Sequence, residues 1–207
     1  MKISWQGTIE GVQPRIRLMR SYDERSHTYL GYVLLLNGIV EGVSQDFTVA
    51  IGKAAQEKHD FQVGDQIEGL AEPVSDERQE IAKYYKASKL RILDRGPEVN
   101  DNPPPWTGLV PVLETYRQRR HRRLAARTYD LKCRSCIWGC KMPVEIIIDH
   151  WNPSKRKYRF ETFCYGPKSC SFYSTGPTRK VLGRRGMTWE EEDWIDEEST
   201  SHRSQNE

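Results

Sequence analysis

The chain has 207 residues, of which 37% are hydrophobic and 29% are charged, and its formal net charge is +3 at pH 7. This length and apolar content favour two modest domains over one large core. No run of 18 apolar residues occurs and the N-terminal residues lack an apolar signal core, so we expect a cytoplasmic protein without a membrane span. All five cysteines lie within residues 133–170, and in a reducing compartment this clustering indicates metal binding rather than disulfides.

The charges are distributed unevenly along the chain. Residues 1–96 carry 13 Lys or Arg against 14 Asp or Glu, residues 97–185 carry 18 against 7, and residues 186–207 carry 1 against 8. A basic middle followed by an acidic tail predicts either a polyanionic partner or a tail that folds back on the basic surface.

Residues 1–96 show strand-like patterns separated by turns. The pattern over residues 14–19 alternates Arg15 and Arg17 with apolar side chains, which predicts one cationic and one apolar face. A short helix is expected within residues 76–85. Further strands are expected at residues 29–36, at residues 47–51, in a stretch ending near Pro73, and at residues 88–93.

Five strands, a helix before the last strand and a Val-Gly-Asp turn before the fourth strand resemble the OB-fold, a small Greek-key barrel common in nucleic-acid-binding proteins. The resemblance implies an OB-like antiparallel barrel over residues 1–96. Another small antiparallel barrel of unrelated use would show the same pattern, because strand order and not a fixed motif defines the OB-fold. In both cases the predicted fold class is mainly β with some α.

The second half begins with a polar, proline-rich segment that we expect to be a linker. Residues 112–127 then lack proline and glycine and are rich in good helix formers, which predicts an arginine-rich helix. Residues 144–149 and 158–163 read as the strands of a hairpin with a basic tip. The predicted organisation is an OB-like barrel over residues 1–96, a linker over 97–110, a metal-binding domain over 111–185 and an acidic tail over 186–207.

The cysteines form two pairs around this hairpin. Cys133 and Cys136 make a C-x2-C pair, whose tight loop turns two thiolates toward one cation. Cys164 and Cys170 make a return pair with five intervening residues, wider than the usual two. Two pairs that flank a hairpin resemble a zinc ribbon, in which the metal joins the ends of a sheet too small to fold alone. The resemblance implies one structural zinc bound by these four cysteines.

Cys140 leaves a second arrangement open. Together with the C-x2-C pair it reads C-x2-C-x3-C, a spacing that can hold three corners of an iron-sulfur cluster, with a cysteine of the return pair as the fourth ligand. The protein would then be a redox or electron-transfer protein whose basic surface docks an acidic partner. His150, at the end of a predicted strand, is a further candidate to replace one thiolate.

Two clusters of cations predict contact with nucleic acid. A run of arginines on the expected helix repels itself unless phosphates neutralise it, and guanidinium groups bind phosphate oxygens in a bidentate manner. The hairpin tip adds an aromatic ring among cations, a combination suited to backbone contact and base stacking. We therefore expect RNA or single-stranded DNA to be bound mainly through phosphates by Arg15, Arg17, Arg119, Arg120, Arg122, Arg123, Lys155, Arg156, Lys157, Tyr158 and Arg159.

The acidic tail carries apolar side chains that are costly to leave in water. Trp189, Trp194 and Ile195 lie within residues 187–198, where most other positions are Glu or Asp. The tail is therefore expected to dock on the basic surface of its own chain or to recruit a protein partner. In the second case the chain is an interaction scaffold.

The common catalytic motifs are missing from the sequence. It contains no Gly-x-Ser-x-Gly elbow, no phosphate-binding loop and no His-Glu-x2-His motif. Asp149 and His150 are adjacent, but no third partner can be identified from spacing. We therefore expect a binding protein without catalytic residues, and an enzymatic role would have to come from redox chemistry at the cysteines.

Overall fold

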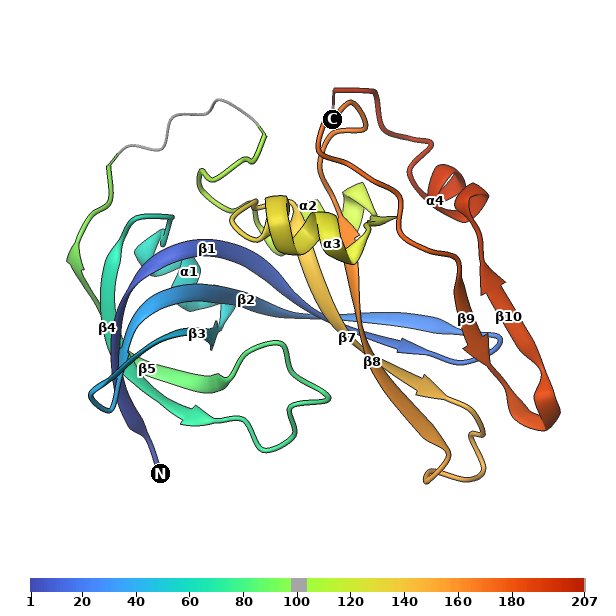
Figure 1. The fold of residues 1–207 in the computed structure, drawn as a ribbon, viewed down its shortest axis with the longest axis horizontal. Helices are drawn as coiled ribbons and strands as arrows, with labels where there is room; N and C mark the ends of the chain where they lie inside the picture. Colours follow the sequence, from blue (N-terminus) through green and yellow to red (C-terminus); the bar gives the residue numbers. More distant parts are fainter. Residues whose placement is uncertain (98–103, 207) are drawn as a thin grey trace.

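A closed ring of five strands forms the N-terminal half of the fold (Figure 1). The computed structural model describes residues 1–97 and 104–206. The strands of the ring are β1 (Ile3–Arg20), β2 (Arg25–Val40), β3 (Val43–Ile51), β4 (Gln66–Pro73) and β5 (Tyr84–Asp94). β1 pairs with both β2 and β4, β3 pairs with β2, and β5 closes the ring between β3 and β4. β3 and β5 run parallel, and the other neighbours run antiparallel.

The helix of this half lies between β3 and β4, where α1 spans Lys53–His59. Residues 76–85, for which the sequence predicts a helix, instead form a loop with turns that leads into β5. In this loop Asp76 accepts a hydrogen bond from the backbone N–H of Arg78, and Glu80 accepts one from Ile81. Such local side-chain bonds satisfy backbone groups that a helix would otherwise pair, which explains why the prediction is wrong.

β1 and β2 are long enough, at 18 and 16 residues, to continue beyond the ring. A shift of register between Arg15 and Ile16 marks the place where the pair bends. Gly31 lies opposite this bulge with a φ of +130°, and a Cβ atom there would lie 2.3 Å from the carbonyl oxygen of Ile51. The bend therefore requires glycine at this position.

The C-terminal half adds three strands to the same sheet: β6 (Arg122–Arg123), β7 (Gly139–Ile147) and β8 (Arg156–Cys164). The end of β1 pairs in parallel with β7, and β8 joins β7 to β6. One hydrophobic core includes Ile16 from β1 and Val144 from β7. A single sheet and core thus continue across the predicted linker, of which residues 98–103 lie outside the described residues.

The arginine-rich segment is not one helix over residues 112–127. α2 ends after Leu113–Arg119, and the chain then forms β6, α3 (Ala126–Thr128) and the π-helical turn η1 (Tyr129–Cys133). Arg120 has a φ of 58°, which ends the helix. The helix prediction is wrong because the next residues pair with β8 and bury Arg123 and Leu124 completely or nearly so, and this packing outweighs local helix propensity.

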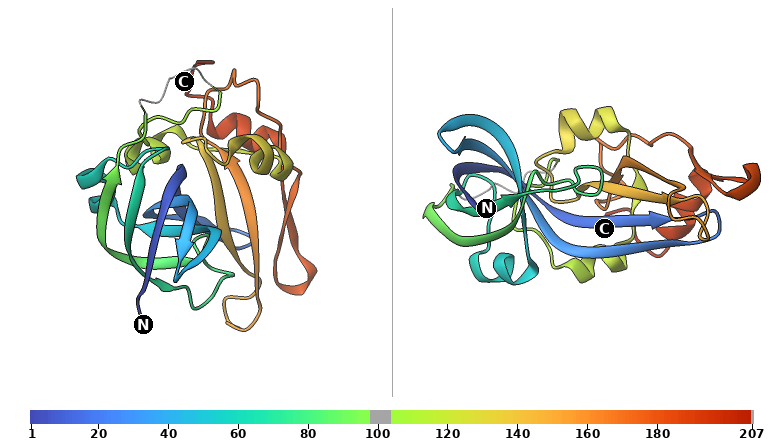
Figure 2. Two further views of the ribbon diagram at one scale, coloured as in Figure 1. Left: turned by 60° about the vertical axis from the view of Figure 1, so that its left-hand side comes forward. Right: turned by 90° about the horizontal axis from the view of Figure 1, so that it is seen from below.

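The acidic tail folds against the rest of the molecule (Figures 1 and 2). β9 (Arg179–Leu182), the turn η2 (Arg184–Gly186) and β10 (Thr188–Glu191) form a hairpin, and α4 spans Asp193–Ser199. Ile195 and Asp196 of α4 are buried. The mainly β fold class is confirmed, and none of the helices in the described ranges is long and apolar enough to cross a membrane.

Candidate metal centre and basic surface

Four of the five cysteines line one enclosed cavity. Cys133 ends η1, Cys136 lies in the following turn, Cys164 ends β8, and Cys170 lies in the loop after β8. The cavity has a volume of about 10 Å³. Its aromatic walls come from Trp106, Trp138, Phe172 and Tyr173. The structure thus brings together the two pairs predicted from the sequence, and none of the four thiols is in a disulfide.

The environment of these thiols is apolar but offers backbone donors. Burial raises the pKa of Cys133 to about 12 and that of Cys136 to about 11. Hydrogen bonds from the backbone near Trp138 and Gly139 oppose the shift at Cys136. The backbone N–H of Gly166 donates a hydrogen bond to the Cys164 sulfur at 3.4 Å. N–H groups directed at sulfur are the partners that a metal-bound thiolate needs in a buried site.

The four thiols are of the ligand type that binds zinc, but they lie too far apart in this structure to coordinate one ion. No group of three or more Cys, His, Asp or Glu side chains among residues 1–97 and 104–206 is close enough together to hold a metal ion. Four thiols around one cavity are nevertheless the ligand type that zinc takes in structural sites. Cys140 does not line this cavity, since its thiol is fully buried and donates to the carbonyl oxygen of Pro14 at 3.4 Å. His150 is exposed and borders a different pocket.

Gln13 of β1 connects the cysteine loop to the rest of the sheet. Its Nε2 donates to the carbonyl oxygens of Cys133, Arg134 and Cys136 at 2.8, 3.0 and 3.0 Å. The hydroxyl of Tyr129 donates to its Oε1 at 2.6 Å. These bonds orient the C-x2-C loop from a strand 120 residues away, and a single glutamine in a strand gives no sequence signal for such a role.

Three of the four predicted helix arginines hold the fold together. Arg123 is fully buried and donates to Asp196 and to the carbonyl oxygen of Glu191, so no part of it faces solvent. Arg119 donates to the carbonyl oxygen of Tyr165 and stacks over Trp138. Arg122 donates to the carbonyl oxygen of Pro167 and stacks over Tyr173 at 3.8 Å from the ring centroid. Arg120 is exposed.

The other predicted cations are mostly paired with carboxylates. Arg15 forms hydrogen bonds with the buried carboxylate of Glu80, and Arg17 lies 3.8 Å from the same group. At the β7–β8 hairpin, Arg156 pairs with Glu145, and Arg159 pairs with Glu161. Tyr158 is covered by the guanidinium of Arg78 at 4.8 Å, so its ring face is occupied by a neighbour. Lys155 and Lys157 are exposed at the hairpin tip and form no ion pair with any described residue.

A different set of cations and rings follows one face of β2. Arg25, His27 and Tyr29 alternate along the strand, and the end of α2 adds Arg117 and Arg120. We call these five residues the basic strip. The Arg117 guanidinium lies 4.8 Å from the centroid of the Tyr29 ring. Arg117 and Arg120 are exposed and form no ion pair with a carboxylate in the described part of the chain.

Burial and the neighbouring cations act together on His27. Burial, together with the charges of Arg25, Arg20 and Arg120, lowers the pKa of His27 to about 4. Burial also lowers the pKa of His121, whose ring centroid lies 5.0 Å from that of His27. The strip is therefore positive through its guanidinium groups, while its imidazole is neutral at pH 7.

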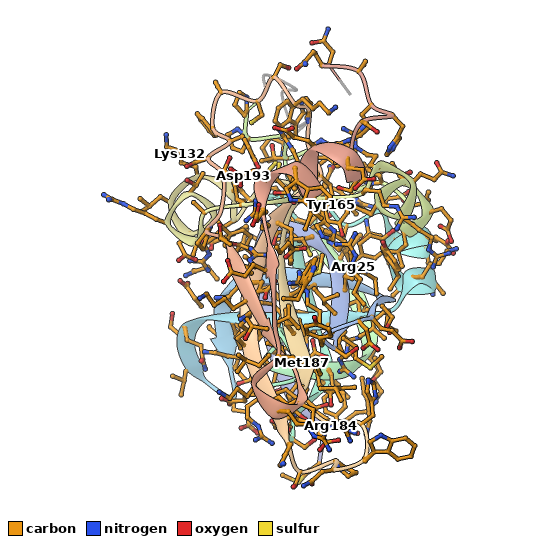
Figure 3. The ribbon with its side chains drawn as sticks, turned by 90° about the vertical axis from the view of Figure 1, so that its right-hand side faces the viewer. Arg25, Lys132, Tyr165, Arg184, Met187 and Asp193 are labelled. Carbon is orange, nitrogen blue, oxygen red and sulfur yellow. The ribbon has the colours of Figure 1, made fainter. Side chains whose placement is uncertain are left out.

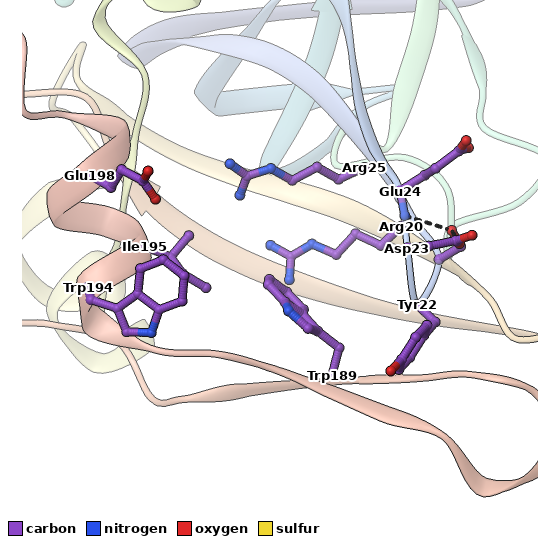
Figure 4. A pocket seen from close by; sticks show the side chains of 10 residues that line it. Arg20, Tyr22, Asp23, Glu24, Arg25, Trp189, Trp194, Ile195 and Glu198 are labelled. Carbon is purple, nitrogen blue, oxygen red and sulfur yellow. Dashed lines mark hydrogen bonds between the residues drawn. The ribbon is translucent and has the colours of Figure 1, made fainter.

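Beyond Arg25 the strip reaches a pocket of about 300 Å³ between the β1–β2 turn and the tail (Figure 4), which we call the tail pocket. It is lined by Arg20, Ser21, Tyr22, Asp23, Glu24, Arg25, Trp189, Trp194, Ile195 and Glu198. Figure 3 locates this face of the molecule, with Arg25 near its centre and Asp193 at the start of α4. Sequence reasoning singled out the tryptophans but did not place them beside the β1–β2 turn.

Comparisons with known proteins supply no relative. No family model matches the chain, and no curated protein or solved structure matches it. The function is therefore inferred from the geometry and chemistry of these surfaces.

Proposed function

We propose that the protein binds RNA or single-stranded DNA along the basic strip. The observation that carries this proposal is the exposure of Arg117 and Arg120 beside the ring of Tyr29, without carboxylate partners in the described residues. Guanidinium groups without carboxylate partners bind phosphate oxygens. Arg120 is the one residue of the strip that the sequence analysis also predicted to contact nucleic acid.

The five-stranded ring supports a comparison with the OB-fold. OB-folds bind oligonucleotides with the face of strands 2 and 3 and with the loops that follow strands 1 and 4. The basic strip lies on the part of β2 that continues beyond the ring toward the β1–β2 turn, so in an OB-like barrel it would correspond to the loop after strand 1 and not to the face that strands 2 and 3 share. The proposed OB-like ring and the position of the strip therefore support the same function.

Zinc has a structural role in this proposal. Cys133, Cys136, Cys164 and Cys170 would hold it, and the metal would link the loop after η1 to the end of β8. These segments flank the β7–β8 hairpin, as in the proposed ribbon-like arrangement. The cross-link stabilises the layer that carries α2, because Arg119 and Arg122 bond to carbonyl groups just after Cys164.

The proposal is tested by neutralising the strip. In the variant Arg117→Gln/Arg120→Gln, the affinity for a labelled single-stranded oligonucleotide should fall, measured by fluorescence anisotropy at several salt concentrations. Each lost phosphate contact on a single strand removes about 0.7 from the slope of log K against log salt, so the slope should decrease by about 1.4.

The matched control is Lys58→Gln/Lys89→Gln, which removes the same charge from exposed positions outside the strip. It should leave the slope of log K against log salt close to that of the unmodified protein. Equal slopes for the unmodified protein and the strip variant would reject the strip as the binding surface. The same oligonucleotide sequence as RNA and as DNA shows which is preferred.

A further inference from the structure

The tail pocket combines two indole rings with guanidinium groups. Trp189 comes from β10 and Trp194 from α4, while Arg20 and Arg25 come from the two strands that flank the β1–β2 turn. In Figure 4 both guanidinium groups extend toward α4, and the Trp189 ring lies below them. A volume of about 300 Å³ suits one planar ring system rather than several.

Trp194 is placed for contact with a ligand. Its side chain is 57% exposed, although the next residue, Ile195, is buried in the same short helix. The helix is therefore fixed to the body through Ile195 and presents the indole at the pocket. An indole held in this way is a stacking surface that needs no rearrangement before a flat ring binds.

Two buried carboxylates hold Arg20 beside these rings. It is 1% exposed and lies 2.8 Å from Glu191 and 3.2 Å from Glu161. Its guanidinium nitrogens are buried and ion-paired, so the guanidinium that a ligand can reach is that of Arg25, whose side chain is 41% exposed and lies 3.3 Å from Glu191. Ring carbonyl oxygens and nitrogens of nucleobases are acceptors that a guanidinium group recognises. Glu198, on the opposite wall, can accept a hydrogen bond from an exocyclic amine.

Arg25 belongs to both the basic strip and the tail pocket. A strand whose phosphates follow Arg117, Arg120 and Arg25 therefore brings its next nucleotide to the mouth of the pocket. We infer that the tail pocket receives one unpaired nucleobase of the bound strand, stacked on Trp194 and recognised at its edge by Arg25. This inference rests on the proposed nucleic-acid function and extends it from phosphate contact to base contact.

The test compares an ordinary single-stranded oligonucleotide with an abasic strand of the same length and charge. The unmodified protein should bind the strand with bases about tenfold more tightly, since stacking on an aromatic side chain contributes at about this level for each base. Trp194→Ala should lose most of this difference and keep its affinity for the abasic strand. Trp194→Phe keeps an aromatic face and should recover most of the preference.

The matched control is Trp151→Ala, which removes an 85% exposed tryptophan that does not line the tail pocket. It should keep the preference for bases. If Trp194→Ala keeps this preference as well, the inference is wrong. If both strands bind equally to the unmodified protein with an intact salt dependence, the nucleobase site is rejected and the phosphate strip stands. If neither strand binds, both the strip and the pocket assignments fail.

Discussion

Arg123 and Asp196 meet in the interior, where the Arg123 Nε donates a 2.9 Å hydrogen bond to the Asp196 Oδ2. The backbone N–H of Arg123 donates to the same oxygen at 3.1 Å. The two residues are 73 positions apart, and they join the basic middle of the chain to its acidic end. Arg123 is 0% exposed and Asp196 is 6% exposed, so this contact is part of the core and is not a loose surface pair.

Replacing Asp196 with alanine should destabilise the whole protein. The substitution leaves the buried Arg123 guanidinium with only the exposed carboxylate of Asp193 and two backbone carbonyl groups. Removing the buried partner of such an ion pair typically costs about 3–5 kcal/mol. The free energy of unfolding, measured by urea denaturation, should fall by about 3 kcal/mol. Glu197→Ala removes an exposed carboxylate from the same helix and should change little. A loss no greater than that of Glu197→Ala would show that the pair adds no stability.

The same pair explains which parts of the fold could be predicted from the sequence. The strands over residues 29–36 and 47–51 were visible as local apolar patterns, because a short run of apolar residues can be recognised without knowledge of the rest of the fold. The local pattern over residues 112–127 predicted one long helix and could not reveal that the segment is divided into several shorter elements. The helix is interrupted where Arg123 contacts Asp196, and helix propensity, which depends on local sequence alone, cannot predict such a long-range contact.

The candidate site was predictable to a similar extent. Cysteine spacing indicated that Cys133, Cys136, Cys164 and Cys170 would gather, because thiols have few other uses in such a cluster. The role of Gln13 depends on β1 passing beneath the cysteine loop, and this follows from sheet order. The sequence did not predict the basic strip, because charge alone does not show which arginines bond to a carbonyl or carboxylate group in the folded chain and which remain exposed.

Substitution of Gly31 by alanine should be far more damaging than the size of a methyl group suggests. The new Cβ would lie 2.3 Å from the backbone oxygen of Ile51, in a conformation that side chains rarely adopt. Separating β2 from β3 or straightening the bulge should cost about 2–4 kcal/mol of unfolding free energy. Thermal or urea unfolding measures this loss.

Gly42→Ala is the matched comparison for this effect. Gly42 also has a positive φ, +85°, but a Cβ there would meet nothing within 4 Å. Its cost should be limited to backbone strain, about 1 kcal/mol. Equal losses for the two variants would mean that φ alone, and not the contact with Ile51, sets the requirement for glycine.

Acidification should weaken the fold through His27. Its pKa is about 4 in the folded protein, below the ordinary value of 6.5, because burial and the charges of Arg25, Arg20 and Arg120 disfavour the imidazolium form. The unfolded chain therefore binds the proton first as the pH falls. The stability associated with neutral His27 is complete above pH 6.5 and is lost between pH 6.5 and 4, at up to about 1.4 kcal/mol per pH unit.

His27→Phe isolates this contribution from the carboxylates that titrate in the same range. Urea denaturation at pH 7.0, 6.0 and 5.0 should give a shallower fall in unfolding free energy for His27→Phe than for the unmodified protein. His150→Phe, at an exposed histidine on the β7–β8 turn, should keep the original slope. Identical slopes for all three proteins would exclude His27 as the source of acid sensitivity.

Metal analysis of protein purified without oxygen should give about one zinc per chain and no visible colour, because four thiols line a single cavity. Cys136→Ser should lose the zinc and lower the thermal stability, while Cys140→Ala should keep the zinc, since that thiol faces Pro14 in the core. Chelation of the metal should reproduce the loss of stability seen for Cys136→Ser. Iron with acid-labile sulfide, lost from both variants, would instead place Cys140 among the ligands and favour electron transfer over a structural role.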